Sequence, residues 1–237
     1  MGENIRYAVQ IGAADEEGAS DAKMYDEAIV DAAYAQELGY SSVWMVEHHF
    51  SDYYPTPNPL MFLSHLAAAC PGLGLGTAVM VLPWYDPLRF AEDVAMLRTL
   101  AKGRLDIGMG RGTAKLEYDA MRVPMGEARD RFRECWEVTQ LALRGEPFTY
   151  EGQFVSIDKP ITMRPHIDPS REINFYGAIG SPASAEIMAD LGLTPLSLAQ
   201  FPDYMLVKIL DKWRARAGQR GMNTNVSLPI SAKCFIG

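Results

Sequence analysis

Short apolar runs alternate with longer segments of helical periodicity along most of the chain. The short runs are rich in small, aromatic and β-branched residues, as buried strands are. They cover residues 5–11, 42–46, 74–82, 104–108, 173–179, 196–199 and 226–236. The longer segments cover residues 23–38, 59–69, 87–100, 127–144, 184–191 and 202–217. This alternation of strands with helices predicts βαβ units and a parallel sheet.

The alternation is interrupted once, between residues 148 and 170. Residues 148–157 alternate around Glu151-Gly152 and predict a hairpin, and residues 160–170 form a proline-rich connector. Seven predicted strands in sequence suit a (β/α)8 TIM barrel whose last strand and helices this chain lacks. An open, doubly wound sheet is the alternative. We expect residues 1–237 to be a single barrel domain, incomplete at its C-terminal end, because a barrel that stops at its seventh strand leaves an open edge.

Composition and charge argue against several classes of protein. With 48% hydrophobic and 22% charged residues, the chain has enough apolar material for a core and is not intrinsically disordered. The formal net charge of −8 argues against a nucleic-acid partner. No apolar run is long enough for a membrane span, and the N-terminus lacks a secretory pattern. Cys70, Cys135 and Cys234 lie too far apart for a disulfide framework, so we expect a cytoplasmic protein.

The first candidate site is Glu47-His48-His49, directly after the second predicted strand. In a barrel this loop lies on the C-terminal face, where active sites are found. Successive side chains point to opposite sides, so only one histidine can face the barrel mouth. There it would be suited to proton transfer. The alternative is a structural histidine with a second one on the surface. No metal site is expected, because no third ligand stands at a useful spacing.

Two turns that are rich in glycine or serine offer sites for an anion. Residues 108–113 include Gly110 and Arg111; glycine lets backbone N–H groups approach a ligand, and arginine supplies a fork for phosphate. A tight turn whose arginine pairs with a surface carboxylate is the alternative. Ser181 and Ser184, at the start of a predicted helix, would bind an anion, and plain helix capping is the other reading.

Five motifs follow one another along the chain. They are MVEHHF at 45–50, GTAVMVLP at 76–83, GRLDIGMGRG at 103–112, EARDRFRE at 127–134 and YEGQF at 150–154. Together they resemble the bacterial-luciferase-like monooxygenase family. The resemblance implies a (β/α)8 barrel that binds reduced FMN or, in one branch, the deazaflavin F420. It also implies a flavin-dependent monooxygenase that forms a C4a-(hydro)peroxyflavin with O2 and oxygenates a small organic substrate.

The resemblance assigns roles residue by residue. It implies that His48 is the catalytic residue and that the flavin is bound by Glu47, Ala78, Val79, Gly110, Arg111, Ser181 and Ser184. The arginine and the serines would contact the phosphate. Ala78-Val79 match a dipeptide that often forms a non-proline cis peptide under the flavin ring, and Glu47 would line the edge of that ring. Gly110 stands where luciferase has a reactive cysteine, so light emission is not expected.

The implied reaction needs a dry pocket, because water and stray protons destroy the oxygenated flavin. Trp44, Met80 and Met109 near the mouth would supply apolar walls, with core packing as the alternative. No nicotinamide fingerprint is present, so a separate flavin reductase would deliver the reduced FMN. Family members commonly pair through early barrel helices, which implies a homodimer through residues 23–38 and 59–69. An F420-dependent oxidoreductase and a non-catalytic flavin-binding relative remain as alternative functions.

Overall fold

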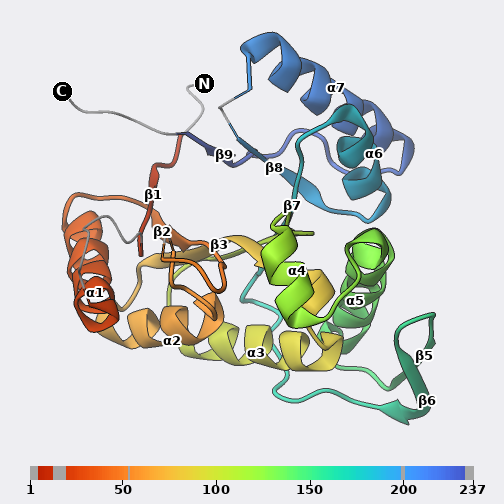
Figure 1. Cartoon of the computed structure of the whole chain (residues 1–237), viewed down its shortest axis with the longest axis horizontal. Coiled ribbons are helices and arrows are strands. Elements are labelled where there is room, and N and C mark those ends of the chain that lie inside the picture. Colours follow the sequence, from red (N-terminus) through yellow and green to blue (C-terminus); the bar gives the residue numbers. More distant parts are fainter. Residues whose placement is uncertain (1–4, 13–19, 53, 199–200, 233–237) are drawn as a thin grey trace.

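Seven parallel strands form one curled sheet in the computed structural model, which describes residues 5–12, 20–52, 54–198 and 201–232 (Figure 1). The strand order in the sheet is β1-β2-β3-β4-β7-β8-β9, and every neighbouring pair is parallel. Their bounds are β1 Ala8–Gln10, β2 Ser42–Met45, β3 Gly74–Val81, β4 Leu105–Gly110, β7 Asn174–Ala178, β8 Thr194–Leu198 and β9 Ile230–Ser231.

The helices follow the strands and, apart from the short helix α4, cover the outer face of the curl (Figure 1). Their bounds are α1 Asp21–Glu37, α2 Pro59–Ala69, α3 Pro87–Leu100, α4 Lys115–Met121, α5 Ala128–Leu143, α6 Pro182–Asp190 and α7 Asp203–Gln219, with 3-10 turns η1 Leu82–Trp84 and η2 Met125–Glu127. The antiparallel hairpin of β5 Phe148–Glu151 and β6 Ser156–Ile161 projects away from the sheet. Within the described residues, none of the helices combines the length and apolar character needed to span a membrane.

The order of the strands decides between the two predicted architectures. A doubly wound sheet reverses its strand order at a switch point, whereas this sheet adds each main strand beside the previous one in a single direction. The expected luciferase-like barrel architecture is therefore confirmed as a curled, parallel half-barrel with helices. Strands β1 and β9 lie at the two edges of the sheet.

Polar side chains begin several of the helices at the positions that the sequence favours. Ser20 caps α1, Asn58 accepts from Met61 N before α2, and Asp86 accepts from two backbone amides before α3. Gly39, with φ +82°, follows the end of α1, where a left-handed residue commonly terminates a helix. The predicted ranges 59–69 and 87–100 therefore match α2 and α3 at both ends.

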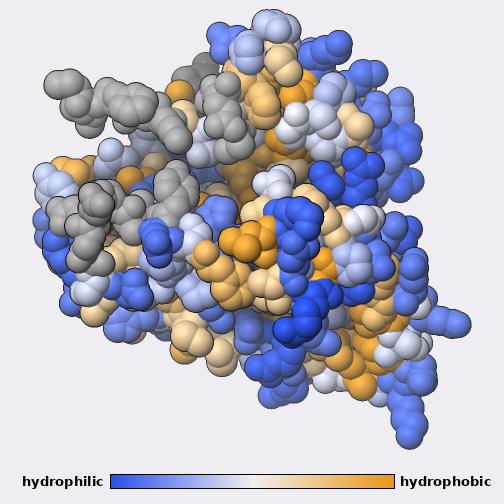
Figure 2. All heavy atoms as spheres, viewed as in Figure 1, coloured by the Kyte–Doolittle hydropathy of each residue, from blue (hydrophilic) through white to orange (hydrophobic). Residues whose placement is uncertain are grey.

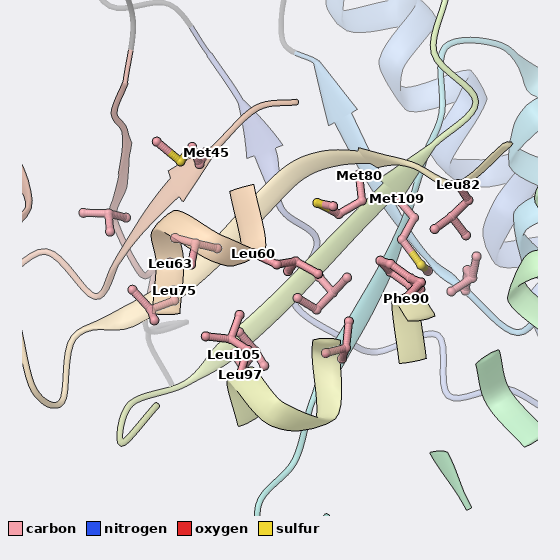
Figure 3. Close-up of a cluster of buried hydrophobic side chains, with 14 of the residues drawn as sticks. Met45, Leu60, Leu63, Leu75, Met80, Leu82, Phe90, Leu97, Leu105 and Met109 are labelled. Atoms are coloured by element: carbon pink, nitrogen blue, oxygen red, sulfur yellow. The ribbon is translucent and has the colours of Figure 1, made fainter. Parts of the chain in front are cut away.

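The main hydrophobic core lies between the sheet and the helices that cover it, with members from α1, α2, α3, α5, α6 and α7. Figure 3 shows this cluster, and its labelled members are Met45, Leu60, Leu63, Leu75, Met80, Leu82, Phe90, Leu97, Leu105 and Met109. The placement of Met80 and Met109 as walls of an open mouth is wrong, since both side chains are 0% exposed. The pairing of β3 with β4 shifts register between Thr77 and Met80, and this shift brings Met80 opposite Met109 in the core.

Several predicted bounds also need correction. Strand β4 continues to Gly110, two residues beyond the predicted end, so the turn after it begins at Arg111. Helix α4 was not predicted at all. The last predicted strand, 226–236, is reduced to β9 within the described residues, and its residues 233–236 lie outside them. Ala199, the last residue of the predicted strand 196–199, also lies outside the described residues. Trp44 is partly buried, and its indole lies beside Gly76 and Tyr176.

Gly76 makes room for Trp44 inside the curl of the sheet. A methyl group added to Gly76 would lie 2.5 Å from Cδ2 of the Trp44 indole, far inside van der Waals contact. We expect Gly76→Ala to lower the free energy of unfolding by about 1–3 kcal/mol through overpacking, measured by urea denaturation. Gly126→Ala is the matched control, because nothing lies within 4 Å of the added methyl group. Equal stability of the two variants would contradict this packing.

Candidate active site

The loops that follow β2, β3, β4 and β7 lie at one rim of the sheet. These four strands are consecutive neighbours and run parallel, so their carboxyl ends meet at the same edge. Glu47-His48-His49 follow β2, Arg111 follows β4, and the N-terminus of α6 follows β7. The structure thus brings the three sequence-predicted clusters to a common rim.

The buried carboxylate of Glu47 ties the loop after β2 to the end of β3. Its side chain is 1% exposed; Oε2 accepts from the backbone N of Val81 at 2.8 Å, and Oε1 lies 2.9 Å from Nε2 of His49. Burial, followed by the charge of Glu47 and a hydrogen bond to it, raises the pKa of Tyr85 well above its usual range. Because both of its oxygens have protein donors, the Glu47 carboxylate holds the loop after β2 against the end of β3.

The two adjacent histidines point to different surroundings. The side chain of His48 is 38% exposed, and its ring stacks on Tyr54 at a centroid distance of 5.9 Å and an interplanar angle of 15°. The side chain of His49 is only 11% exposed and meets Trp84 edge to face at 5.3 Å. His48 is therefore the histidine that a ligand at the rim can reach, and His49 is the structural member of the pair.

Helix α4 contributes two residues that the sequence pattern did not single out. The Glu117 side chain is 5% exposed, and its Oε1 lies 3.0 Å from Nδ1 of His48 and accepts from the backbone N of His49 at 2.8 Å. Tyr118 donates its hydroxyl to the carbonyl of Arg111. Burial and the nearby Glu117 raise the pKa of Tyr118 to about 12, with Arg111 opposing them. The absence of Gly and Pro between residues 113 and 123 was the one sequence signal for this helix.

Arg111 begins the turn after β4 and is partly buried. Its expected alternative partner, a surface carboxylate, is not found among the described residues, where its guanidinium forms no ion pair. Gly112 follows with φ +71°, and a methyl group added there would lie 2.8 Å from Cγ1 of Val81. The turn is thus held by the hydrogen bond from Tyr118 to the Arg111 carbonyl and by the left-handed backbone of Gly112.

Ser181 and Ser184 form a reciprocal cap at the N-terminus of α6. Ser181 Oγ accepts from Ser184 N at 3.2 Å, and Ser184 Oγ accepts from the backbone N of Ser181 and of Gly180 at 3.0 and 3.1 Å. Helix capping is therefore established for both serines. The same helix terminus presents donors and a positive dipole end to the rim, which is the arrangement that binds anions in many proteins.

The ends of β3 and β4 approach each other closely at the rim. The peptide bond between Ala78 and Val79 is cis, which confirms the geometry that the family resemblance implies for this dipeptide. A methyl group added to Gly110 would lie 2.7 Å from Cγ2 of Val79 and 3.6 Å from Cβ of Ala178. The lack of a side chain at Gly110 is therefore required by packing. Among the described residues, no group of His, Cys, Asp and Glu side chains is arranged to hold a metal ion.

Residues 7–237 match the family model described as luciferase-like monooxygenase. The chain belongs to this family. The resemblance seen in the five sequence motifs is confirmed, and with it a flavoprotein monooxygenase fold of the TIM-barrel type.

Relatives of the chain within the family are longer. The oxygenase component of a flavin-dependent trigonelline monooxygenase from Acinetobacter baylyi is 31% identical over 183 residues, which are 74% of this chain and 50% of that protein. The solved monooxygenase RslO1 from Streptomyces bottropensis has a TM-score of 0.88 at 28% identity, covering 96% of this chain and 70% of RslO1. An F420-dependent secondary alcohol dehydrogenase has a TM-score of 0.80 at 17% identity, covering 95% of this chain and 68% of the dehydrogenase; this shows a shared fold. The chain spans about half the length of the sequence relatives it matches.

Loss of the hydrogen bonds that Glu47 makes to Val81 and His49 should lower the stability of the protein. Glu47→Ala leaves a buried amide and a nearly buried imidazole without their acceptor, so we expect the free energy of unfolding to fall by about 2–4 kcal/mol. Glu92→Ala is the control, because its pair with Arg89 is largely exposed (41% and 72%) and should contribute less than about 1 kcal/mol. Urea unfolding of both variants measures the difference, and a loss for Glu47→Ala no larger than for the control would refute the tie.

Proposed function

We propose that this chain carries the flavin site of a monooxygenase that uses reduced FMN and O2 to oxygenate a small organic substrate. The observation that carries the proposal is the placement, at one rim, of a reachable histidine held by a buried carboxylate and of Arg111, which forms no ion pair with any described residue. Membership in the luciferase-like monooxygenase family supports the same reaction class.

The residues at the rim fit the phosphate end of FMN. Arg111 would pair with the phosphate oxygens through its guanidinium fork. Ser181, Ser184 and the backbone donors at the N-terminus of α6 would complete the phosphate site from the neighbouring strand β7. Binding energy gained at the phosphate, remote from the reacting atoms, would position the ring.

The ring end of the cofactor would lie over the backbone where β3 and β4 approach their carboxyl ends. Ala78, Val79 and Gly110 would lie under the ring, since Ala78 has a small side chain and Gly110 has none, which lets a flat group approach the backbone. Glu47 would support the edge of this surface through Val81 and His49. Bound flavin supplies the electrons that activate O2 for transfer to a substrate.

His48 would act as the catalytic residue that takes or returns a proton at its Nε2 atom. The surroundings are suited to limit water. Trp84 and Tyr118 pack edge to face at 5.4 Å behind the histidine loop. Apolar side chains also emerge near this rim: Leu116 of α4 is 63% exposed and Phe50 is 62% exposed. Figure 2 shows hydrophobic atoms among polar ones on the face that carries α4. These would contact an organic substrate.

FMN is favoured over F420 as the cofactor, because the relative at 31% identity is flavin-dependent by name, whereas the F420 enzyme shares the fold at 17% identity. That relative is an oxygenase component, which supports a separate flavin reductase as partner. A homodimer through α1 and α2 is also proposed. Val30, Tyr34 and Leu38 of the first helix segment and Met61 of the second are 58–71% exposed, and a monomer on a sizing column would count against it.

The phosphate role of Arg111 predicts a cofactor-specific effect. Loss of a charged hydrogen-bonding group should weaken FMN binding by about 10- to 100-fold in Arg111→Ala. Riboflavin lacks the phosphate, so its affinity should not change. Fluorescence titration of both ligands measures this, with Arg133→Ala, an exposed arginine on α5, as the control. An equal loss for FMN and riboflavin would contradict the assignment.

The role of His48 predicts a change in the oxidative half-reaction. After anaerobic loading with reduced FMN, an O2 pulse should reoxidise the bound flavin more slowly than free flavin. We expect His48→Ala to alter this rate by about 10- to 100-fold. His65→Ala, an exposed histidine on α2, should behave as the unmodified protein does. Reoxidation as fast as free FMN, in the unmodified protein and in His48→Ala alike, would overturn the proposed oxygenase chemistry.

A further inference from the structure

Glu117 brings a nearly buried carboxylate to the most reachable histidine of the rim. It lies on α4, 69 positions after His48, and contacts it through Oε1 and Nδ1 at 3.0 Å. The same oxygen accepts from the backbone N of His49 at 2.8 Å. With its side chain only 5% exposed, the carboxylate is well shielded from competing water.

These contacts select one form of the neutral imidazole. A carboxylate oxygen can only accept hydrogen bonds, so the nitrogen facing it must carry the proton. In neutral histidine just one ring nitrogen is protonated, and Nε2 is then left with its lone pair. We infer that Glu117 is a positioning residue that holds His48 in the Nδ1–H form, so that Nε2 is the proton acceptor. The chemical use of that acceptor rests on the proposed function.

The orientation of the ring is set by contacts from a second side. Tyr54 stacks on the His48 ring, and the Tyr54 hydroxyl accepts from Nε2 of Gln10 on β1 at 2.8 Å. Stacking fixes the plane of the ring, whereas the carboxylate decides which nitrogen lies on which side. Glu117 therefore does more than fill space beneath the loop.

The position of the carboxylate is itself tied to the proposed phosphate turn. The next residue, Tyr118, is 1% exposed and donates to the carbonyl of Arg111. Two adjacent residues of α4 thus connect the histidine loop after β2 with the turn after β4. This places the base and the phosphate-binding arginine on one local framework, and Glu117 is the member that contacts the base.

The tautomer can be observed without cofactor or substrate. In protein labelled with 15N-histidine, long-range proton–nitrogen spectra at a pH where His48 is neutral distinguish Nδ1–H from Nε2–H. His48→Gln assigns the signal among the four histidines. We expect Nδ1–H in the unmodified protein and a shift toward Nε2–H in Glu117→Ala, with Glu117→Asp restoring the original form in part. An Nε2–H signal in the unmodified protein would overturn the inference, whatever the variants do.

Glu134→Gln is the matched control. Glu134 is also buried and accepts from backbone amides, but at Gln153, Phe154 and Val155 of the hairpin. The tautomer of His48 should not change in this variant, and an unchanged tautomer in folded Glu117→Ala would refute the inference. Reoxidation of bound reduced FMN should change about 10- to 100-fold in Glu117→Ala, with FMN affinity retained. If flavin does not bind at all, the proposed function fails while the tautomer measurement still stands.

Discussion

Two buried carboxylates hold the rim of this half-barrel together. Glu47 joins the loop after β2 to the end of β3, and Glu117 joins that same loop to the helix that follows β4. A buried carboxylate is costly unless donors surround it, and here backbone amides and the two histidines supply them. These hydrogen bonds therefore connect the loop after β2 to the end of β3 and to α4.

The sheet beneath the rim supplies the rigid base for these ties. At its amino-terminal end, Arg104 donates from Nε to both carboxylate oxygens of Asp106 at 2.8 Å and from Nη2 to the hydroxyl of Tyr176 at 2.8 Å. This network joins β4 to β7 far from the rim. Between the two ends, glycines at strand positions let neighbouring backbones and the Trp44 indole approach closely. Polar ties at both ends and close packing between them fix the strands whose ends carry the site.

Much of this architecture follows from pattern in the sequence. Helical periodicity with a preceding cap determined α2 and α3 to the residue, because both helices begin with proline after a capping side chain. The alternation of strands and helices was sufficient for the parallel sheet. The motif positions led to His48 and to the turn at Arg111. Each of these features depends on residues that are close together in the chain.

The features that the pattern did not reveal depend on contacts between distant segments. Helix α4 has seven residues and no side-chain cap, so the lack of Gly and Pro between residues 113 and 123 is the one local feature that marks it. Glu117 gains its role only when the fold brings it to His48. Met80 and Met109 were placed at an open mouth, whereas both side chains are buried in the core. The register shift between Thr77 and Met80, which sets Met80 opposite Met109, arises in the pairing of β3 with β4 and is not visible in either strand alone.

The central claim is that the loops after β2, β4 and β7 together bind one flavin. A crystal structure of the protein with FMN tests it most directly. We expect the phosphate between Arg111 and the N-terminus of α6, with the flavin ring over Ala78-Val79 and near His48. Density for FMN at another place, or a phosphate far from Arg111 while the ring lies elsewhere, would contradict it.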